Sequence, residues 1–426
     1  MFQNFNITFF VCGYFNFSFA DDFVEDEFAD DDIDEIIETS ATSEDDIKIN
    51  SRIAIAYDRD TGKTIWGKDE NKRTAMASTT KIMTAIVTVE NANLDDIVTV
   101  SAKAAGTGGS KLGLKKGDKI SLRDLLYGLM LRSGNDAAIA IAEHIGGNVE
   151  DFASLMNSKA AELNLQDTHF VTPHGLDDPN HYTTAFELAK IADYALKNEI
   201  IAKVVASKYY TININGYPKD LINTNELLGN LNGVYGVKTG FTNNAGRCLV
   251  TSIKRDNLDI ITVVIQADTK KDRTKDSVKI IEYVYENFEK VNVKDIVDRE
   301  FENWCYINKG RINIDKAKNS YIDLKISELT NDVIVVKKKD IDNIINIKNN
   351  IIYKYNRFFN EHYKIDEEHS YLRYIIFYSF ASISLYDTFF QKPDVLSKLY
   401  NTNRKKEGAV NPHIIFPAHY PLQLMH

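Results

Sequence analysis

Ser78-Thr79-Thr80-Lys81, followed by the apolar run of residues 82–89, is the stretch of this 426-residue sequence that decides the fold. The run predicts a buried helix, and the hydroxyl groups just before it suit a helix N-cap, which puts Ser78 at the helix start. Residues three apart on a helix share one face, with Cβ atoms about 5–6 Å apart. The amine of Lys81 would therefore reach the hydroxyl of Ser78 and take its proton, as a serine nucleophile requires.

Two more short motifs follow along the chain, Ser133-Gly134-Asn135 and Lys238-Thr239-Gly240. A serine three residues before a lysine occurs by chance in most proteins of this size. Three motifs in this order, at intervals that suit one catalytic domain, form a specific signal. The second motif is expected in the loop after an apolar helix, residues 122–131, where Gly134 permits the turn. There Ser133 can relay a proton and Asn135 can donate to a substrate amide carbonyl.

The third motif falls in a predicted strand, residues 234–241. Gly240 leaves room for an extended substrate at the strand edge, where Lys238 and Thr239 would hold a terminal carboxylate. A positive charge on Lys238 also disfavours a second charged amine nearby, so it would help Lys81 to stay neutral and act as a base. The backbone N–H groups of Ser78 and Phe241 are the expected donors to an oxyanion.

A longer segment resembles a known family. Residues 168–185, Thr-His-Phe-Val-Thr-Pro-His-Gly-Leu-Asp-Asp-Pro-Asn-His-Tyr-Thr-Thr-Ala, are similar to the signature of serine-type D-Ala-D-Ala carboxypeptidases, the low-molecular-mass penicillin-binding proteins. Residues 50–290 resemble the catalytic domain of that family throughout. The resemblance implies an α+β fold, a β-lactamase/transpeptidase-like domain. In that domain an antiparallel sheet is flanked by helices, and a helical lobe closes one side of the cleft.

The same resemblance implies a reaction and a role for each motif. Ser78 would be the acylated nucleophile and Lys81 its base. The residues that match the other two motifs of the family are Ser133, Asn135, Lys238, Thr239 and Gly240. The implied substrate is a peptidoglycan stem peptide that loses its terminal D-alanine. β-Lactams, which mimic the D-Ala-D-Ala end, would acylate Ser78, and no metal or organic cofactor is implied.

Hydrophobic periodicity and turn signals predict the elements of this domain. A hairpin is expected from residues 52–57 and 64–67. Helices are expected at about 122–132, 136–145, 149–164, 184–196 and 272–288, and strands at 235–241, 246–255 and 258–267.

Charge and composition divide the N-terminal part of the chain. Residues 1–20 resemble an export signal peptide, although no Lys or Arg precedes Lys48. Residues 21–47 are expected to be an acidic, disordered linker, since residues 21–46 hold fourteen Asp or Glu and no Lys or Arg. That segment carries more negative charge than the net −10 of the whole chain, and no basic face for nucleic acid is evident.

The catalytic domain is expected to span residues 48–290, and two regions follow it. Residues 291–341 predict a small β-rich region, and residues 342–426 a tail of irregular or helical structure. Residues 374–386 of the tail are apolar but shorter than the ~20 residues that span a bilayer, so the expectation there is either an interfacial helix in peripheral membrane contact or a buried helix. The signal peptide and the family resemblance together predict a secreted or envelope-associated protein.

Several other side chains have competing interpretations. His169, His174 and His181 do not have usual metal-ligand spacing, so hydrogen bonds that order their loop are expected instead of a metal site. The adjacent Asp177 and Asp178 are expected to be cap or turn residues, and Cys248 a packed thiol. Arg247 is expected either to face the cleft or to be a solvated strand charge.

Two other functions compete with the carboxypeptidase. In a β-lactamase of the same fold and commonest class, a glutamate holds the deacylating water. The one matching Glu-x-x-x-Asn between Ser133 and Lys238 is Glu226 with Asn230, close to the third motif. A non-catalytic cell-wall-binding protein is the alternative of another class. Labelling by fluorescent penicillin separates them: stable label, rapid turnover, or none.

Overall fold

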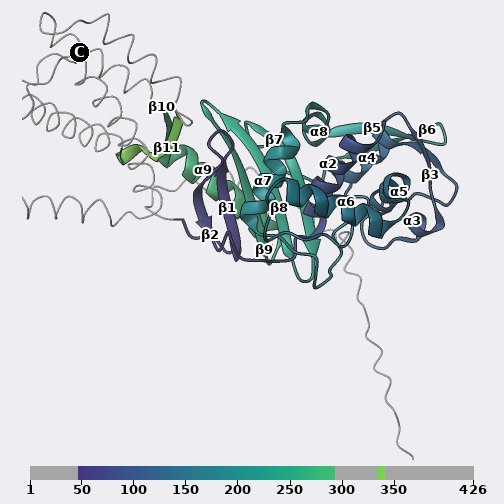
Figure 1. Cartoon of the computed structure of the whole chain (residues 1–426). Coiled ribbons are helices and arrows are strands. Elements are labelled where there is room, and N and C mark those ends of the chain that lie inside the picture. Colours follow the sequence, from purple (N-terminus) through teal and green to yellow (C-terminus); the bar gives the residue numbers. More distant parts are fainter. Residues whose placement is uncertain (1–46, 293–332, 341–426) are drawn as a thin grey trace, which may run out of the picture. The chain divides into compact units, whose positions relative to one another are not determined.

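A five-stranded antiparallel sheet forms the centre of the computed structural model, which describes residues 47–292 and 333–340 (Figure 1). Its strand order is β2-β1-β9-β8-β7. The strands are β1 (Ile53–Asp58), β2 (Lys63–Lys68), β7 (Val234–Thr242), β8 (Gly246–Arg255) and β9 (Leu258–Ala267). Strand β7 carries the third motif and lies at the edge of the sheet, so one of its sides is open to other segments.

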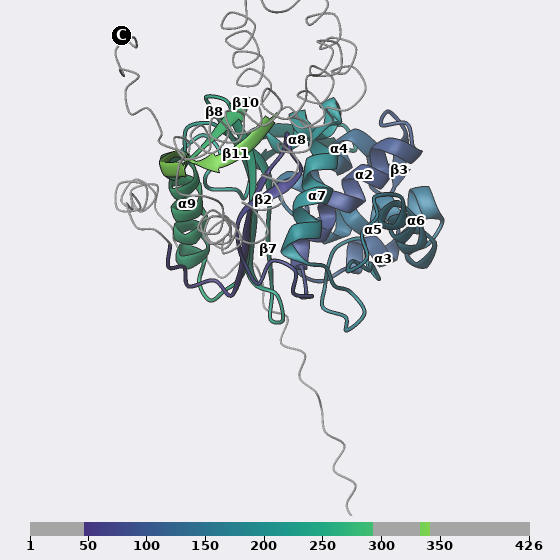
Figure 2. The same ribbon diagram turned by 60° about the vertical axis from the view of Figure 1, so that its left-hand side comes forward.

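The two faces of the sheet pack against different helices. Successive side chains of a strand point to opposite faces. In β1, Ile53 and Ile55 belong to a large apolar cluster shared with helices α2 (Lys81–Asn91) and α7 (Ala185–Leu196), whereas Ala54 and Ala56 belong to a second cluster shared with α9 (Lys270–Asn287). Figure 2 shows α9 on one side of the sheet and the other long helices on the opposite side.

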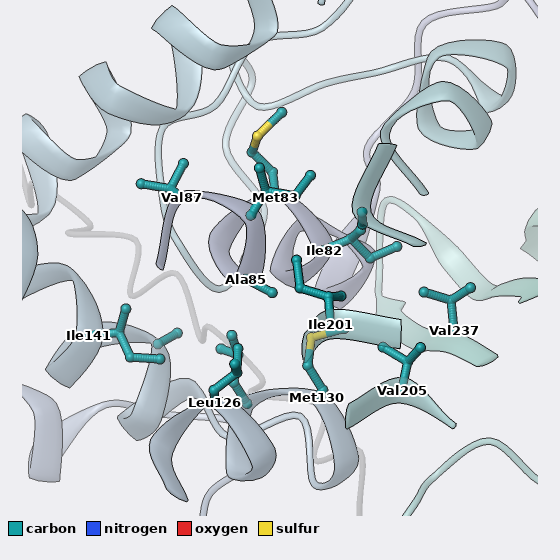
Figure 3. Close-up of a cluster of buried hydrophobic side chains, with 14 of the residues drawn as sticks. Ile82, Met83, Ala85, Val87, Leu126, Met130, Ile141, Ile201, Val205 and Val237 are labelled. Atoms are coloured by element: carbon teal, nitrogen blue, oxygen red, sulfur yellow. The ribbon is translucent and has the colours of Figure 1, made fainter. Parts of the chain in front are cut away.

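Helix α2 (Lys81–Asn91), which follows Ser78, is the centre of the helical lobe. The helices packed against it are α4 (Leu122–Leu131), α5 (Asn135–Gly146), α6 (Val149–Glu162), α7 (Ala185–Leu196) and α8 (Glu199–Val205). Ile82, Met83, Ala85 and Val87 of α2 are all buried, in one cluster with Leu126, Met130, Ile141 and Ile201 from its neighbours (Figure 3). A helix that is apolar on nearly every side is expected to be enclosed in this way, and the predicted buried helix is confirmed.

A second, smaller sheet lies at the far end of the lobe. Its strands, in the order β3-β4-β5-β6, are β3 (Ile97–Thr99), β4 (Lys119–Ser121), β5 (Tyr209–Ile214) and β6 (Tyr217–Ile222), and α3 (Ala102–Gly106) follows β3. This sheet was not predicted from the sequence. The hairpin β5–β6 turns at Asn215 and Gly216, whose φ angles of 54° and 84° are typical of a type I′ turn.

Most predicted elements of the catalytic domain are confirmed. The hairpin of β8 and β9 has the predicted bounds, and the helices agree within two residues at each end. Helix α9 begins at Lys270, two residues before the predicted start, because the Thr269 side chain accepts a hydrogen bond from the Asp272 N–H and caps the helix. Helix α8 was not predicted.

The remaining regional predictions fall mainly on other parts of the chain. The signal peptide, the acidic linker up to residue 46 and the tail after residue 341 lie outside the described residues. Of the β-rich region, the structure describes β11 (Val333–Lys337), which pairs with β10 (Phe288–Asn292), and the short helix η2 (Lys338–Asp340). Among residues 47–292 and 333–340, no helix is both long and apolar enough to cross a membrane.

Candidate active site

Ser78 lies in a short 3₁₀ helix, η1 (Ala77–Thr80), immediately before α2. The prediction that a hydroxyl caps the helix N-terminus is wrong, because no side chain caps either η1 or α2. Thr79 Oγ1 donates to Met76 O at 2.5 Å and Thr80 Oγ1 donates to Ala77 O at 2.7 Å. These hydroxyls bond backwards to carbonyls of the preceding turn, so they tighten the turn that presents Ser78 and leave its N–H groups uncapped by side chains.

The amine of Lys81 is enclosed by three oxygen atoms. Lys81 Nζ lies 2.7 Å from Ser78 Oγ, 2.7 Å from Asn135 Oδ1 and 2.9 Å from the backbone oxygen of His174. Lys81 has no exposed surface and Ser78 is 6% exposed. The distance between Nζ and Oγ is short enough for direct proton transfer, so two of the three motifs meet as predicted.

Ser133 adopts the strained conformation in the second motif. Its φ is 57°, whereas Gly134 has an ordinary φ of −58°, so the prediction that Gly134 permits the turn is wrong. Gly134 is needed for space, since a Cβ there would lie 3.0 Å from Asp136 Oδ1 and 3.1 Å from Leu112 Cγ. Within the part of the chain that the structure describes, Ser133 Oγ is buried without a hydrogen-bond partner. Such a hydroxyl is available to a substrate atom.

Asn135 begins α5 and holds two segments together. Its Oδ1 accepts from Lys81 and its Nδ2 donates to Gly108 O at 2.8 Å. Next to it, the buried carboxylate of Asp136 accepts the backbone N–H groups of Leu112, Gly113 and Leu114 at 2.9–3.0 Å. Asp136 was not among the predicted site residues, although an acidic residue directly after the motif could have indicated it. It anchors the loop to which the Asn135 amide is bonded.

Strand β7 brings the third motif beside Ser78. A Cβ on Gly240 would lie 3.1 Å from the backbone N of Ser78 and 3.2 Å from Ala77 Cβ. A glycine is therefore required at position 240 because η1 approaches the strand closely, whereas the predicted reason was room for a substrate. Lys238 is buried, and its Nζ donates to Thr239 O at 2.9 Å. Thr239 Oγ1 shares a hydrogen bond of 2.8 Å with Thr224 Oγ1, a partner that no sequence motif indicated.

At the end of β7, Phe241 packs against the adjacent strand. The guanidinium of Arg247 lies 3.9 Å from the centroid of the Phe241 ring. This cation–π contact uses the face of the ring, and it gives Arg247 a role that neither predicted alternative included.

The three histidines of the 168–185 segment make hydrogen bonds that order their loop, as expected. His169 Nδ1 bonds to Asn180 O, His174 Nδ1 accepts from the Leu176 N–H, and His181 Nδ1 accepts from the Val171 N–H. Burial lowers the pKa of His174 to about 3, with help from the charge of Lys81, and burial lowers the pKa of His181 to about 4. Both rings are neutral at physiological pH.

The two adjacent aspartates and the cysteine singled out in the sequence make structural contacts. Asp177 accepts from Thr242 Oγ1 at 2.6 Å and so joins the histidine segment to the end of β7, while Asp178 accepts the Asn180 N–H in a turn. The Cys248 thiol is fully buried in the sheet, as predicted.

Glu226 lies on the face of the sheet opposite Lys81. Its Oε1 bonds to Arg273 and Thr274 of α9, and its neighbour Leu227 packs in the α9 cluster. Burial raises the pKa of Glu226, but the charge of Arg273, the hydrogen bond from Thr274 and the charge of Lys270 together outweigh it, so the pKa is lowered. This carboxylate is engaged in an ion pair and does not hold a water beside Ser78.

This chain is similar to known proteins. The family model described as D-alanyl-D-alanine carboxypeptidase matches residues 38–269. The D-alanyl-D-alanine carboxypeptidase DacF of Bacillus subtilis is 34% identical over 310 residues, covering 71% of this chain and 77% of the relative. DacD of Escherichia coli is 35% identical over 294 residues, covering 62% and 75%.

Solved structures agree. The Streptomyces K15 DD-transpeptidase superposes with a TM-score of 0.54 at 35% identity, covering 56% of this chain and 98% of that one. DacD from Francisella tularensis gives a TM-score of 0.54 at 31% identity, covering 58% and 73%. The predicted β-lactamase/transpeptidase-like α+β fold is confirmed.

Proposed function

The chain belongs to the D-alanyl-D-alanine carboxypeptidase family, and from this premise we propose that it removes the terminal D-alanine of peptidoglycan stem peptides through an acyl-enzyme on Ser78. One observation carries the proposal. The amine of Lys81 lies 2.7 Å from Ser78 Oγ in a site where both side chains are buried and a second motif supplies Asn135. A serine, a lysine and an amide in this contact suit acyl transfer without histidine.

Acylation begins when neutral Lys81 takes the Ser78 proton and Oγ attacks the carbonyl carbon of the penultimate D-alanine. The new C–O bond forms as the carbonyl becomes an oxyanion, for which the backbone N–H groups of Ser78 and Phe241 are the proposed donors. The C–N bond then breaks, and the proton passes from Lys81 to the leaving amine. Ser133 is the proposed relay, a role that suits its buried hydroxyl. Water next attacks the ester, and Ser78 regains its proton.

Recognition of the substrate is assigned to β7. Lys238 and Thr239 would bind the terminal carboxylate by charge and hydroxyl, and Asn135 would donate to the substrate amide carbonyl. Thr239 already shares its hydroxyl bond with Thr224, so the substrate would exchange one oxygen partner for another. Gly240 keeps the strand close to Ser78, which brings the carboxylate site and the nucleophile together.

The β-lactamase alternative lacks support, because Glu226 faces α9 instead of the site. We expect β-lactams to acylate Ser78 and to leave slowly. The proposed substrate lies in the cell wall, so we also propose that the protein acts outside the cytoplasm. Peripheral membrane contact through the C-terminal region remains a prediction about residues that the structure does not describe.

The test is incubation of the chain with a pentapeptide ending in D-Ala-D-Ala, scored for released D-alanine. Fluorescent penicillin is added to a parallel sample, and the labelled peptide is identified by mass spectrometry. We expect D-alanine release and a stable adduct on Ser78. Rapid loss of the label would indicate a β-lactamase, and neither label nor release would indicate a non-catalytic wall-binding protein.

A further inference from the structure

Outside the three motifs, the Lys81 amine contacts the backbone oxygen of His174. This carbonyl comes from residues 171–175, which form neither helix nor strand, so contacts with other segments must fix its position. One contact is direct: Thr84 Oγ1 of α2 donates to Pro173 O at 2.6 Å. Gly175 adds another, because its φ is 88° and a Cβ there would lie 1.9 Å from Ala77 O. The segment therefore lies directly on the turn that carries Ser78.

His181 joins this segment to η1 through both nitrogens of its ring. Nδ1 accepts from the Val171 N–H at 2.9 Å, and Nε2 lies 2.7 Å from Thr80 Oγ1. The Thr80 hydroxyl donates its one proton to Ala77 O, so it must accept from His181. These partners together assign the neutral tautomer with its proton on Nε2. Either of the other two protonation forms would place an N–H against the Val171 N–H.

The surroundings of His181 favour this neutral form. The side chain is 3% exposed, and the Phe170 ring packs edge-on against it at 5.7 Å. Burial lowers its pKa to about 4, against a smaller opposing effect of Asp178 and with a small additional effect of His169. In the same segment, His174 is buried too, and the charges of Lys81, His181 and Lys103 add to the lowering of its pKa. The bonds to Thr80 and Val171 therefore persist throughout the physiological pH range.

We propose that His181 is a positioning residue for the Ser78–Lys81 pair, because it holds Thr80 and Val171 together and so sets the His174 carbonyl against the Lys81 amine. The inference rests on the proposed function and adds to it a residue from outside the three motifs. A carbonyl acceptor stabilises the ammonium form of Lys81 and also directs its Nζ toward Ser78. Displacement of this carbonyl should thus change both the acylation rate and the pH at which Lys81 becomes neutral.

Two pairs of substitutions isolate the contact. His181→Asn keeps an oxygen near the position of Nδ1 for the Val171 N–H but loses the donor to Thr80, and His169→Asn is its matched control at an exposed position. Thr80→Val removes the hydroxyl with little change of shape, and Thr80→Ser keeps it. The second pair leaves His181 in place, so it decides the question even where His181→Asn does not fold.

The experiment measures the acylation rate constant of the full chain with fluorescent penicillin from pH 5 to pH 9, divided by the amount of label bound at saturation. D-Alanine release from the pentapeptide gives kcat and KM. We expect His181→Asn and Thr80→Val to slow acylation and lower kcat by about tenfold or more at pH 7, with KM changed less than about twofold. The acid limb of the pH profile should move to lower pH. Thr80→Ser and His169→Asn should stay within about twofold of the parent.

One outcome would contradict the positioning role of His181, and a different one would contradict the proposed function. Parent-like acylation and an unmoved acid limb in both His181→Asn and Thr80→Val would overturn the positioning role, even if their unfolding midpoints fall, because a purely structural residue has that effect. A parent chain that neither binds label nor releases D-alanine would overturn the proposed function itself.

Discussion

The two walls of the site are built in different ways. The catalytic wall, which consists of Ser78, Lys81, Asn135 and the His174 carbonyl, is closed by short hydrogen bonds between buried groups. The proposed recognition wall, residues 238–241 of β7, lies on an edge strand, and its Thr239 hydroxyl bonds to the hydroxyl of Thr224. The first wall is preorganised before substrate arrives, whereas the second offers groups that a substrate can engage.

This difference separates chemistry from binding. Groups that move a proton must be placed to within a fraction of an ångström, so each is held by several elements. A wall that binds an extended peptide needs an open strand edge and a charge. Changes in the catalytic wall should therefore affect rates and stability, and changes in the recognition wall should affect the preference among substrates.

The largest effect is expected from Lys81→Met. Loss of the base should lower the rate of penicillin acylation by about 10²–10⁴-fold, because the Ser78 proton then has no acceptor of comparable strength. Stopped-flow labelling measures the rate, and Lys254→Met, at an exposed position on β8, is the control for loss of a charge. Acylation of Lys81→Met within tenfold of the parent would remove Lys81 from the catalytic wall.

Gly175→Ala tests how rigidly the catalytic wall is packed. The added Cβ would lie 1.9 Å from Ala77 O at a φ of 88°, so we expect a loss of unfolding free energy of about 3 kcal/mol. Gly147→Ala is the matched control, since its φ is 77° but nothing lies within 4 Å of the new Cβ. It should lose only about 1 kcal/mol. Equal losses in urea unfolding would show that the contact with Ala77 contributes nothing.

Lys238→Ala tests the recognition wall. It should raise KM by about 10–100-fold for a peptide with a free terminal carboxylate, because a charge-assisted bond is worth about 1.5–3 kcal/mol. For the same peptide capped as an amide, KM should change less than about threefold. Comparable effects on both peptides would mean that Lys238 does not bind the carboxylate.

The most gradual effect is a loss of stability in mild acid. His174 and His181 have pKa values of about 3 and 4 in the folded chain but an ordinary value near 6.5 when unfolded. Protons therefore bind the unfolded chain more strongly, and the stabilisation present above pH 6.5 decreases as the pH falls toward 4. The slope is up to about 1.4 kcal/mol per pH unit for each histidine.

Urea unfolding at pH 7, 6 and 5 measures this slope above the main titration of the carboxylates. His181→Asn should reduce the slope, and His169→Asn should not. A free energy of unfolding that is unchanged between pH 7 and pH 5 would contradict the neutral, buried state of both rings.

Prediction from sequence succeeded where local pattern decides the structure. Strands β8 and β9 are largely apolar runs on either side of the turn at Asp256-Asn257, and α2 is a largely apolar helix, so their positions follow from the local sequence. Ser78 and Lys81 are one turn apart, so their contact could also be predicted. Each of these features depends on residues close together in the chain.

Prediction failed where no motif marks the partner, because the partner is a backbone atom or a distant side chain outside the three motifs. The His174 carbonyl is 93 residues from Lys81, and a backbone oxygen carries no sequence signal. The bond of His181 to Thr80 spans 101 residues. The N-cap was mispredicted because threonine hydroxyls can bond to a preceding carbonyl as readily as to a following N–H, and only the geometry of η1 decides between the two.

The most direct test replaces the amine of Lys81 by one of lower basicity. Lys81→Cys, alkylated with 2-bromoethylamine, carries a lysine analogue in which sulfur withdraws electrons from the amine. We predict that Lys81→Cys is inactive, that alkylation restores penicillin acylation at Ser78, and that the acid limb of the pH profile moves to lower pH. Restored acylation with the acid limb unmoved would show that another group takes the Ser78 proton.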